Sequence, residues 1–126
     1  MPTEAIQAID VHAHYGTYES VKPNLVNEFM TGGAEVVVRR ARLANTRLTV
    51  VSPLQALTPR GGADPVGGNI EAARTVAATE GLLQWVVVDP LKPRTYEQAD
   101  EMLRLPKCVG IKVHPQRIAS WDHSNL

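Results

Sequence analysis

Apolar runs alternate with segments of helical periodicity along this chain. Four runs have the length and residue types of buried strands, and each ends at a polar residue or a proline: residues 8–14, 48–53, 83–90 and 108–115. Near-continuous apolar runs are typical of strands covered on both faces, and strands that alternate with helices are typical of βαβ units. The pattern therefore predicts an α/β fold with a parallel sheet.

The segments between these runs predict three helices. Residues 34–44 combine valines with arginines and are followed by Asn45, which can end a helix. Residues 68–81 have helical apolar spacing and finish at a glycine, and residues 95–105 begin at a threonine cap and stop before a proline. Residues 58–68 match no glycine-rich phosphate-binding pattern, so we expect a loop above the sheet that serves as a lid or an oligomer contact.

Composition limits the class of protein. The 126 residues suit one domain, and an apolar share of 44% is enough for a core. Basic and acidic residues both number 13, so neither nucleic acid nor a membrane surface is the expected partner. Cys108 is the single cysteine, and no signal-like or membrane-spanning apolar stretch is present. We expect a soluble, cytoplasmic protein with a small-molecule substrate that can form a homo-oligomer.

The spacing of the runs suggests a particular α/β fold. One strand per about 31 residues is the spacing of a (β/α)8 barrel, which has roughly 250 residues in eight units. Residues 1–126 are therefore expected to form a single partial domain, the first four units and N-terminal half of a TIM-type barrel. Residues 121–126 are polar and follow soon after the fourth run, so we expect a truncated chain or gene fragment.

Two histidines stand at the end of the first run. Side chains alternate along a strand, so Asp10, His12 and His14 are expected on one face and the intervening apolar residues on the other, against helices. Two histidines on one face can bind the same divalent ion at about 2.0–2.1 Å through ring nitrogens. Histidines that only make hydrogen bonds within a core are the alternative. Asp10 would orient a ligand, pair with Lys112 or make a structural hydrogen bond.

The fourth run carries a second polar face. Alternation places Gly110, Lys112 and His114 on one side and Ile111 and Val113 on the other. The polar side is expected to be the barrel interior, and its carboxyl end is where barrel active sites open.

Together these motifs resemble the N-terminal half of the amidohydrolase-related metal-dependent hydrolases, TIM-barrel enzymes that include metal-dependent decarboxylases. The resemblance covers nearly the whole chain and rests on residues 9–14, 51–53, 88–90 and 109–115. It implies that His12 and His14 bind a catalytic divalent ion, most commonly zinc. It also implies further ligands, a histidine on a fifth strand and an aspartate on an eighth. Neither strand is present, so the isolated chain is expected to be inactive.

The leading hypothesis is a metal-dependent hydrolase or decarboxylase of a small organic substrate. In it, metal-activated water attacks the substrate, or the metal assists decarboxylation. Lys112 and His114 are the candidate catalytic residues. Lys112 would hold an anionic substrate, bridge two metals as a carboxylated lysine, or form a structural ion pair; His114 would line the substrate pocket or be structural. Two other hypotheses stay open: a noncatalytic half-barrel that self-associates or binds a partner, and a doubly wound nucleotide-binding domain.

Overall fold

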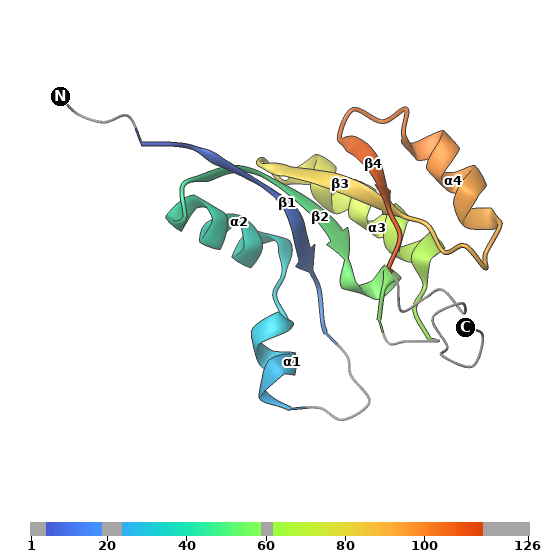
Figure 1. Cartoon of the computed structure of the whole chain (residues 1–126), viewed down its shortest axis with the longest axis horizontal. Helices are drawn as coiled ribbons and strands as arrows, with labels where there is room; N and C mark the ends of the chain where they lie inside the picture. Colours follow the sequence, from blue (N-terminus) through green and yellow to red (C-terminus); the bar gives the residue numbers. More distant parts are fainter. Residues whose placement is uncertain (1–4, 19–23, 59–61, 115–126) are drawn as a thin grey trace, which may run out of the picture.

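The computed structural model describes residues 5–18, 24–58 and 62–114, which form a two-layer α/β fold. Its sheet has four parallel strands in the order β1-β2-β3-β4 (Figure 1), namely β1 Ala8–Tyr15, β2 Thr46–Pro53, β3 Leu82–Val87 and β4 Cys108–Lys112. The predicted α/β class and parallel sheet are confirmed. Among the described strands the order never reverses, and a doubly wound fold binds nucleotides at such a reversal.

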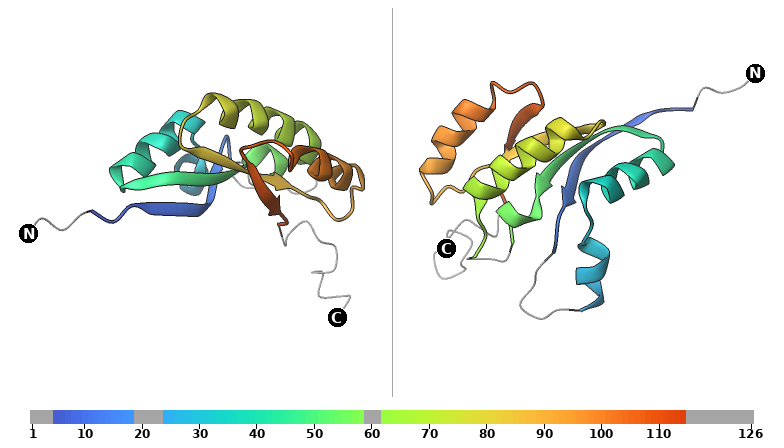
Figure 2. Two further views of the ribbon diagram at one scale, coloured as in Figure 1. Left: turned by 90° about the horizontal axis from the view of Figure 1, so that it is seen from above. Right: turned by 180° about the vertical axis from the view of Figure 1, so that it is seen from behind.

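The three longer helices cover one face of the sheet. These helices, α2 Ala34–Leu43, α3 Pro65–Ala78 and α4 Arg94–Met102, lie on one side in Figure 2, with β1 and β4 on the other. A short helix, α1 Leu25–Met30, and a 3-10 turn, η1 Leu54–Ala56, complete the described elements. We call the other side of the sheet, which carries His14, Ser52 and Lys112, the open face.

The core fills the space between the sheet and these helices. One cluster joins the first two strands to α2 and α3, and a second joins the last two strands to α4: Tyr15, Ala34, Val38, Val51, Ala72, Val76 and Leu82, then Val86, Val88, Ala99, Met102 and Cys108. Burial raises the pKa of the Cys108 thiol, which keeps it protonated. Cys108 therefore acts as packing, as its place in an apolar run suggests.

Asn69 fastens α3 to the sheet. Its side chain is fully buried and forms two hydrogen bonds with the backbone of β3: Nδ2 donates to the Val87 carbonyl at 2.9 Å, and Oδ1 accepts from the Val87 amide at 2.8 Å. Nδ2 also donates to Oε1 of Gln98 on α4, at 2.8 Å. One amide group thus links the sheet and two helices, a role that its predicted position at a helix start did not suggest.

The helix predictions differ from the structure by up to three residues at either end: the helix predicted over 95–105 is α4, which ends at Met102. The helix predicted over 34–44 is confirmed as α2, and Asn45 after it has a left-handed backbone with φ of 53°. The helix predicted to open at Gly68 begins at Pro65 instead, because the Asp64 side chain caps it by accepting from the Gly67 amide. Residues 65–68 of the predicted loop therefore belong to α3, and residues 59–61 of it lie outside the described residues.

Two other expectations concern the chain ends and the membrane. The polar stretch 121–126 and the last residue of the fourth predicted strand lie outside the described residues. Within the described part, no helix has the length and apolar character needed to cross a membrane.

Candidate metal centre

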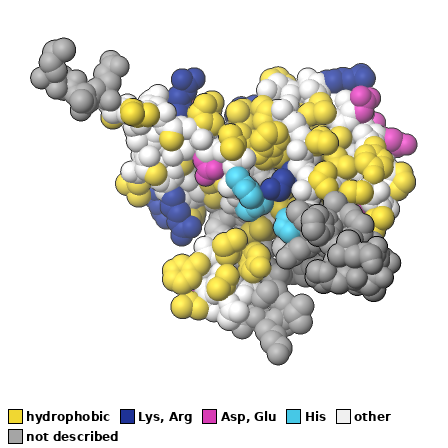
Figure 3. Space-filling model, viewed as in Figure 1, with side chains coloured by type: hydrophobic (Ala, Val, Ile, Leu, Met, Phe, Trp, Pro, Cys, Tyr) yellow, Lys and Arg dark blue, Asp and Glu magenta, His cyan; other side chains and the backbone are white. Residues whose placement is uncertain are grey.

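Side chains from opposite edges of the sheet meet on the open face. Lys112 Nζ on β4 lies 3.1 Å from His12 Nε2 on β1, although the two residues are 100 positions apart in the chain. The rings of His12 and His14 have centroids 5.2 Å apart at an interplanar angle of 79°. Figure 3 views this face, where histidines gather beside a basic side chain among apolar ones. Lys112, which was expected on the polar side of the fourth strand, thus lies beside a histidine of the first.

A bulge in β1 directs the histidines to this face. Asp10 is in register with Thr49, but Ala13 is in register with Val51, so β1 has one extra residue in this interval. Ala13 and Val51 pack on the helix side. His14, the next residue after Ala13, therefore points to the open face.

The same bulge places Asp10 on the opposite side from His14. Its register partner Thr49 is two residues before Val51 and shares the helix-facing side, and Asp10 lines a hollow with α2 residues that include Val37 and Arg40. The prediction that Asp10 shares the histidines' face is wrong, because the extra residue shifts the alternation. Asp10 Oδ1 instead accepts from the His12 backbone amide at 2.9 Å, so Asp10 acts on the bulge and not on an imidazole.

Ser52 orients the His14 ring. His14 Nδ1 lies 3.2 Å from the Ser52 carbonyl oxygen and 3.0 Å from Ser52 Oγ. A carbonyl oxygen can only accept, so Nδ1 donates in the bond to it; in that tautomer Nε2 keeps a lone pair for a metal. This arrangement is typical of a metal-binding histidine held by an outer partner.

The surroundings of His14 also favour its neutral form. Burial lowers the pKa of His14 below its ordinary value, the Ser52 carbonyl raises it, and His12, Lys112 and His114 lower it further by charge repulsion. The net shift is downward. Neutral imidazole is the form that binds a metal. His114 therefore lies close enough to His14 for its charge to act on that ring.

His12 has a different partner. A lysine ammonium can only donate, so His12 Nε2 accepts in the contact with Lys112 and its ring proton lies on Nδ1. A metal bound at Nε2 of both histidines would displace Lys112 from this contact. Lys112 is thus placed to exchange its hydrogen bond to His12 for one to a bound anion.

The donor set is partial. Among residues 5–18, 24–58 and 62–114, no three histidine, cysteine, aspartate or glutamate side chains come together to hold a metal. Two imidazoles can supply two of the four ligands of a tetrahedral zinc ion. A catalytic zinc takes about three protein ligands. His12 and His14 therefore have the donor atoms for part of a zinc coordination sphere, and the described residues do not complete it.

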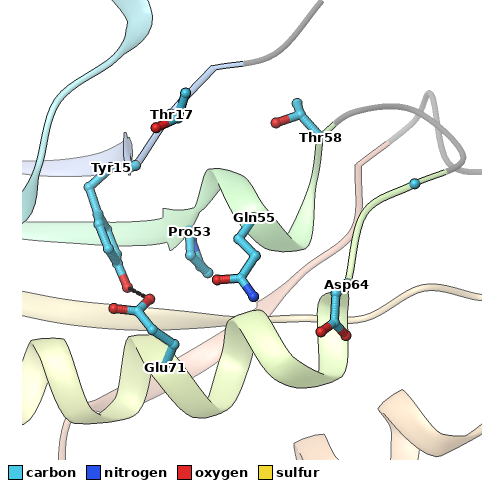
Figure 4. Close-up of a pocket in the computed structure, with 9 residues that line it drawn as sticks. Tyr15, Thr17, Pro53, Gln55, Thr58, Asp64 and Glu71 are labelled. Atoms are coloured by element: carbon cyan, nitrogen blue, oxygen red, sulfur yellow. Dashed lines mark hydrogen bonds between the residues drawn. The ribbon is translucent and has the colours of Figure 1, made fainter.

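A separate cavity lies near the carboxyl ends of β1 and β2. It has a volume of about 460 Å³ and is lined by Tyr15, Gly16, Thr17, Pro53, Gln55, Thr58, Gly62, Asp64 and Glu71. In Figure 4 the Tyr15 ring points toward α3, and its hydroxyl donates to Glu71 at 2.6 Å. Burial, followed by this bond, raises the pKa of Tyr15 well above its ordinary value. The acidic groups here have structural partners, since Asp64 caps α3 and Glu71 also accepts from Thr75.

Two structural features were missed or underrated from the sequence. The sequence gives no sign of the contact between Ser52 and His14, because the register of Ser52 opposite His14 depends on the bulge. Trp85, on β3, reaches the backbone of β1, and its place in an apolar run gave no sign of this contact.

Comparisons of the chain with protein-family models, with curated proteins and with solved structures find no match. The resemblance to amidohydrolase-related hydrolases stays a prediction from the motifs.

Proposed function

We propose that this chain supplies part of the active site of an amidohydrolase-related metal-dependent hydrolase or decarboxylase. His12 and His14 hold a divalent ion, most favourably zinc, and Lys112 and His114 face the substrate. The observation that carries the proposal is the convergence of His12, His14 and Lys112 at the carboxyl ends of β1 and β4. Active sites of (β/α)8 enzymes form at this end of the strands.

The reach of these side chains supports the accompanying proposal of a half-barrel. Adjacent strands are about 4.8 Å apart, so edge strands of a flat four-stranded sheet are separated by roughly 14 Å. Side chains stand roughly perpendicular to a sheet, and those on a flat sheet would not point at one another. Lys112 and His12 nevertheless meet, as side chains do inside a concave barrel wall. Four units with this curvature suit the N-terminal half of a (β/α)8 barrel.

The residues of the site have distinct roles in this mechanism. A bound zinc ion lowers the pKa of a water molecule toward about 7 and polarises a substrate oxygen. Ser52 holds the His14 ring so that Nε2 faces the open side. Lys112 provides a fixed positive charge beside His12 for an anionic group of the substrate. The remaining ligands and the general base come from outside the described residues.

Titration of the chain with zinc, followed by calorimetry, tests the proposal, and Lys112→Met sharpens it. We expect about one bound zinc per chain. Lys112→Met should bind zinc at least as tightly as the unaltered chain does. Lys112 competes for His12, and a unit charge at 4 Å is worth about 1 kcal/mol in water, roughly fivefold in affinity. His114→Ala should leave zinc binding unchanged. No zinc binding by the unaltered chain would refute the metal centre.

Loss of zinc in Lys112→Met would have a different meaning. It would make Lys112 a ligand, as in the carboxylated form, and that form also requires two metals per chain and bicarbonate-dependent loading. Once the substrate is identified, kinetics of the active enzyme test the roles of Lys112 and His114. Lys112→Met and His114→Ala should each lower turnover or raise KM while the metal content stays constant.

Self-association is a second candidate function, favoured by the two edges of the sheet. β1 and β4 are edge strands, and they carry exposed apolar side chains: Ile9 (58% exposed), Val11 (60%), Val109 (45%) and Ile111 (51%). Unpaired edges with apolar side chains promote strand pairing between molecules. A noncatalytic half-barrel would act through these edges.

We expect the 126-residue chain to sediment with a mass that increases with concentration. Lysine at an edge opposes pairing, so Ile111→Lys should shift the distribution toward the monomer. Leu43→Lys is the matched control, because Leu43 is 84% exposed but belongs to helix α2 and not to an edge strand. A monomeric mass at every concentration would rule out this function.

A further inference from the structure

The indole of Trp85 lies across the open face, from β3 over β2 to β1. Its indole Nε1 on β3 donates to the Val11 carbonyl on β1 at 2.8 Å. β2 lies between these two strands, so the indole crosses a whole strand to make this bond. Val11 lies within the bulge and directly precedes His12.

The other end of the indole lies against β4. A Cβ atom added at Gly110 would be 2.4 Å from Trp85 Cζ3 and 3.0 Å from Cε3. Gly110 is two residues before Lys112. One end of the ring therefore contacts the backbone directly before His12, and the other contacts the backbone two residues before Lys112. The ring fits only because position 110 has no side chain.

The hydrogen bond to Val11 lies where the bulge interrupts the pairing of β1 with β2. Register pairing of β1 with β2 stops after Asp10 and resumes at Ala13, so the backbone between them is not in the regular ladder. Asp10 accepts from the amide of His12, and Trp85 donates to the carbonyl of Val11. These two groups are the two sides of one peptide bond, so both hold the plane from which the His12 side chain projects.

We propose that Trp85 is a positioning residue for His12. Through the Val11 carbonyl it fixes the peptide that directs the imidazole toward the centre, and Gly110 provides room for its ring. This inference rests on the proposed function for its effect on metal binding, but its effect on His12 requires no metal.

Trp85→Phe tests the inference because it keeps a ring and removes the indole N–H. In the metal-free chain, we expect the imidazole NMR resonances of His12 to shift while those of His14, held by Ser52, stay in place. Zinc affinity should fall about tenfold, the low end of what loss of an outer partner costs a metal site. The thermal midpoint should hardly change, because Val11 is exposed and water can replace the bond.

Tyr96→Phe is the matched control. Tyr96 also donates from an aromatic side chain to a backbone carbonyl, that of Pro90 at 2.7 Å, but it lies on α4. It should change neither His12 nor zinc affinity. Unshifted His12 resonances in Trp85→Phe would overturn the inference, and so would equal shifts of His12 and His14. If His12 alone shifts and the unaltered chain binds no zinc, the positioning role stands and the proposed function fails.

Discussion

Replacing either histidine of β1 with alanine is expected to remove most of the zinc affinity of the chain. His12→Ala and His14→Ala each delete one of the two imidazoles that β1 supplies. Loss of an outer partner costs a metal site about 10-fold to 100-fold, and loss of a ligand should cost at least as much. Calorimetry with zinc, or the visible absorption of bound cobalt, measures the change.

Asp10→Asn is the control for these variants. Asp10 belongs to the same strand but lies on the helix-facing side, and asparagine keeps the oxygen that accepts from the His12 amide. Its zinc affinity should match that of the unaltered chain. If His12→Ala or His14→Ala binds zinc as tightly as the unaltered chain, that histidine is structural and the proposed centre does not exist.

Asn69→Ala is expected to be the most destabilising of the substitutions considered. It would leave the amide and carbonyl of Val87 and the side chain of Gln98 without their partner in a buried place. Each buried group left without a partner costs about 1–3 kcal/mol, so the free energy of unfolding should fall by roughly 3–5 kcal/mol. Urea denaturation, followed by circular dichroism, measures this loss.

Asn45→Gly is the comparison for Asn69. Asn45 is exposed and has a left-handed backbone conformation that glycine adopts easily, so the change should stay within about 0.5 kcal/mol. A loss below about 1 kcal/mol in Asn69→Ala would mean that water or a shifted Gln98 replaces the asparagine.

Periodicity was enough to predict the strands and most of the helices. Each predicted strand matches an observed one within a few residues, because a strand buried beneath helices needs an apolar run. The prediction failed where a side chain cap decided the boundary, as at Asp64, which starts α3 earlier. It also missed α1, which has no buried residue and begins at a capping box between Asn24 and Asn27.

In the candidate site, too, the local pattern predicted the positions of some residues and failed for others. Alternation correctly placed Gly110 and Lys112 on one face of the sheet, because β4 follows a regular period there. It failed at Asp10, because a bulge changes the phase of a strand without any mark in its residue types. Contacts such as Trp85 with Val11 depend on the curvature of the sheet and the order of its strands, which no local pattern contains.

The sequence by itself thus determined the α/β class, the approximate limits of the strands and the pair of histidines at the end of the first strand. These depend on local periodicity, because burial of one face or both imposes a repeat on neighbouring residues. Only the tertiary structure decided which side chains surround those histidines. The register of β1 against β2 and the inward curve of the sheet bring Lys112 and Ser52 to the histidines and turn Asp10 away. Register and curvature arise from packing between segments distant in the chain, and a single residue of slip reverses the face of a side chain.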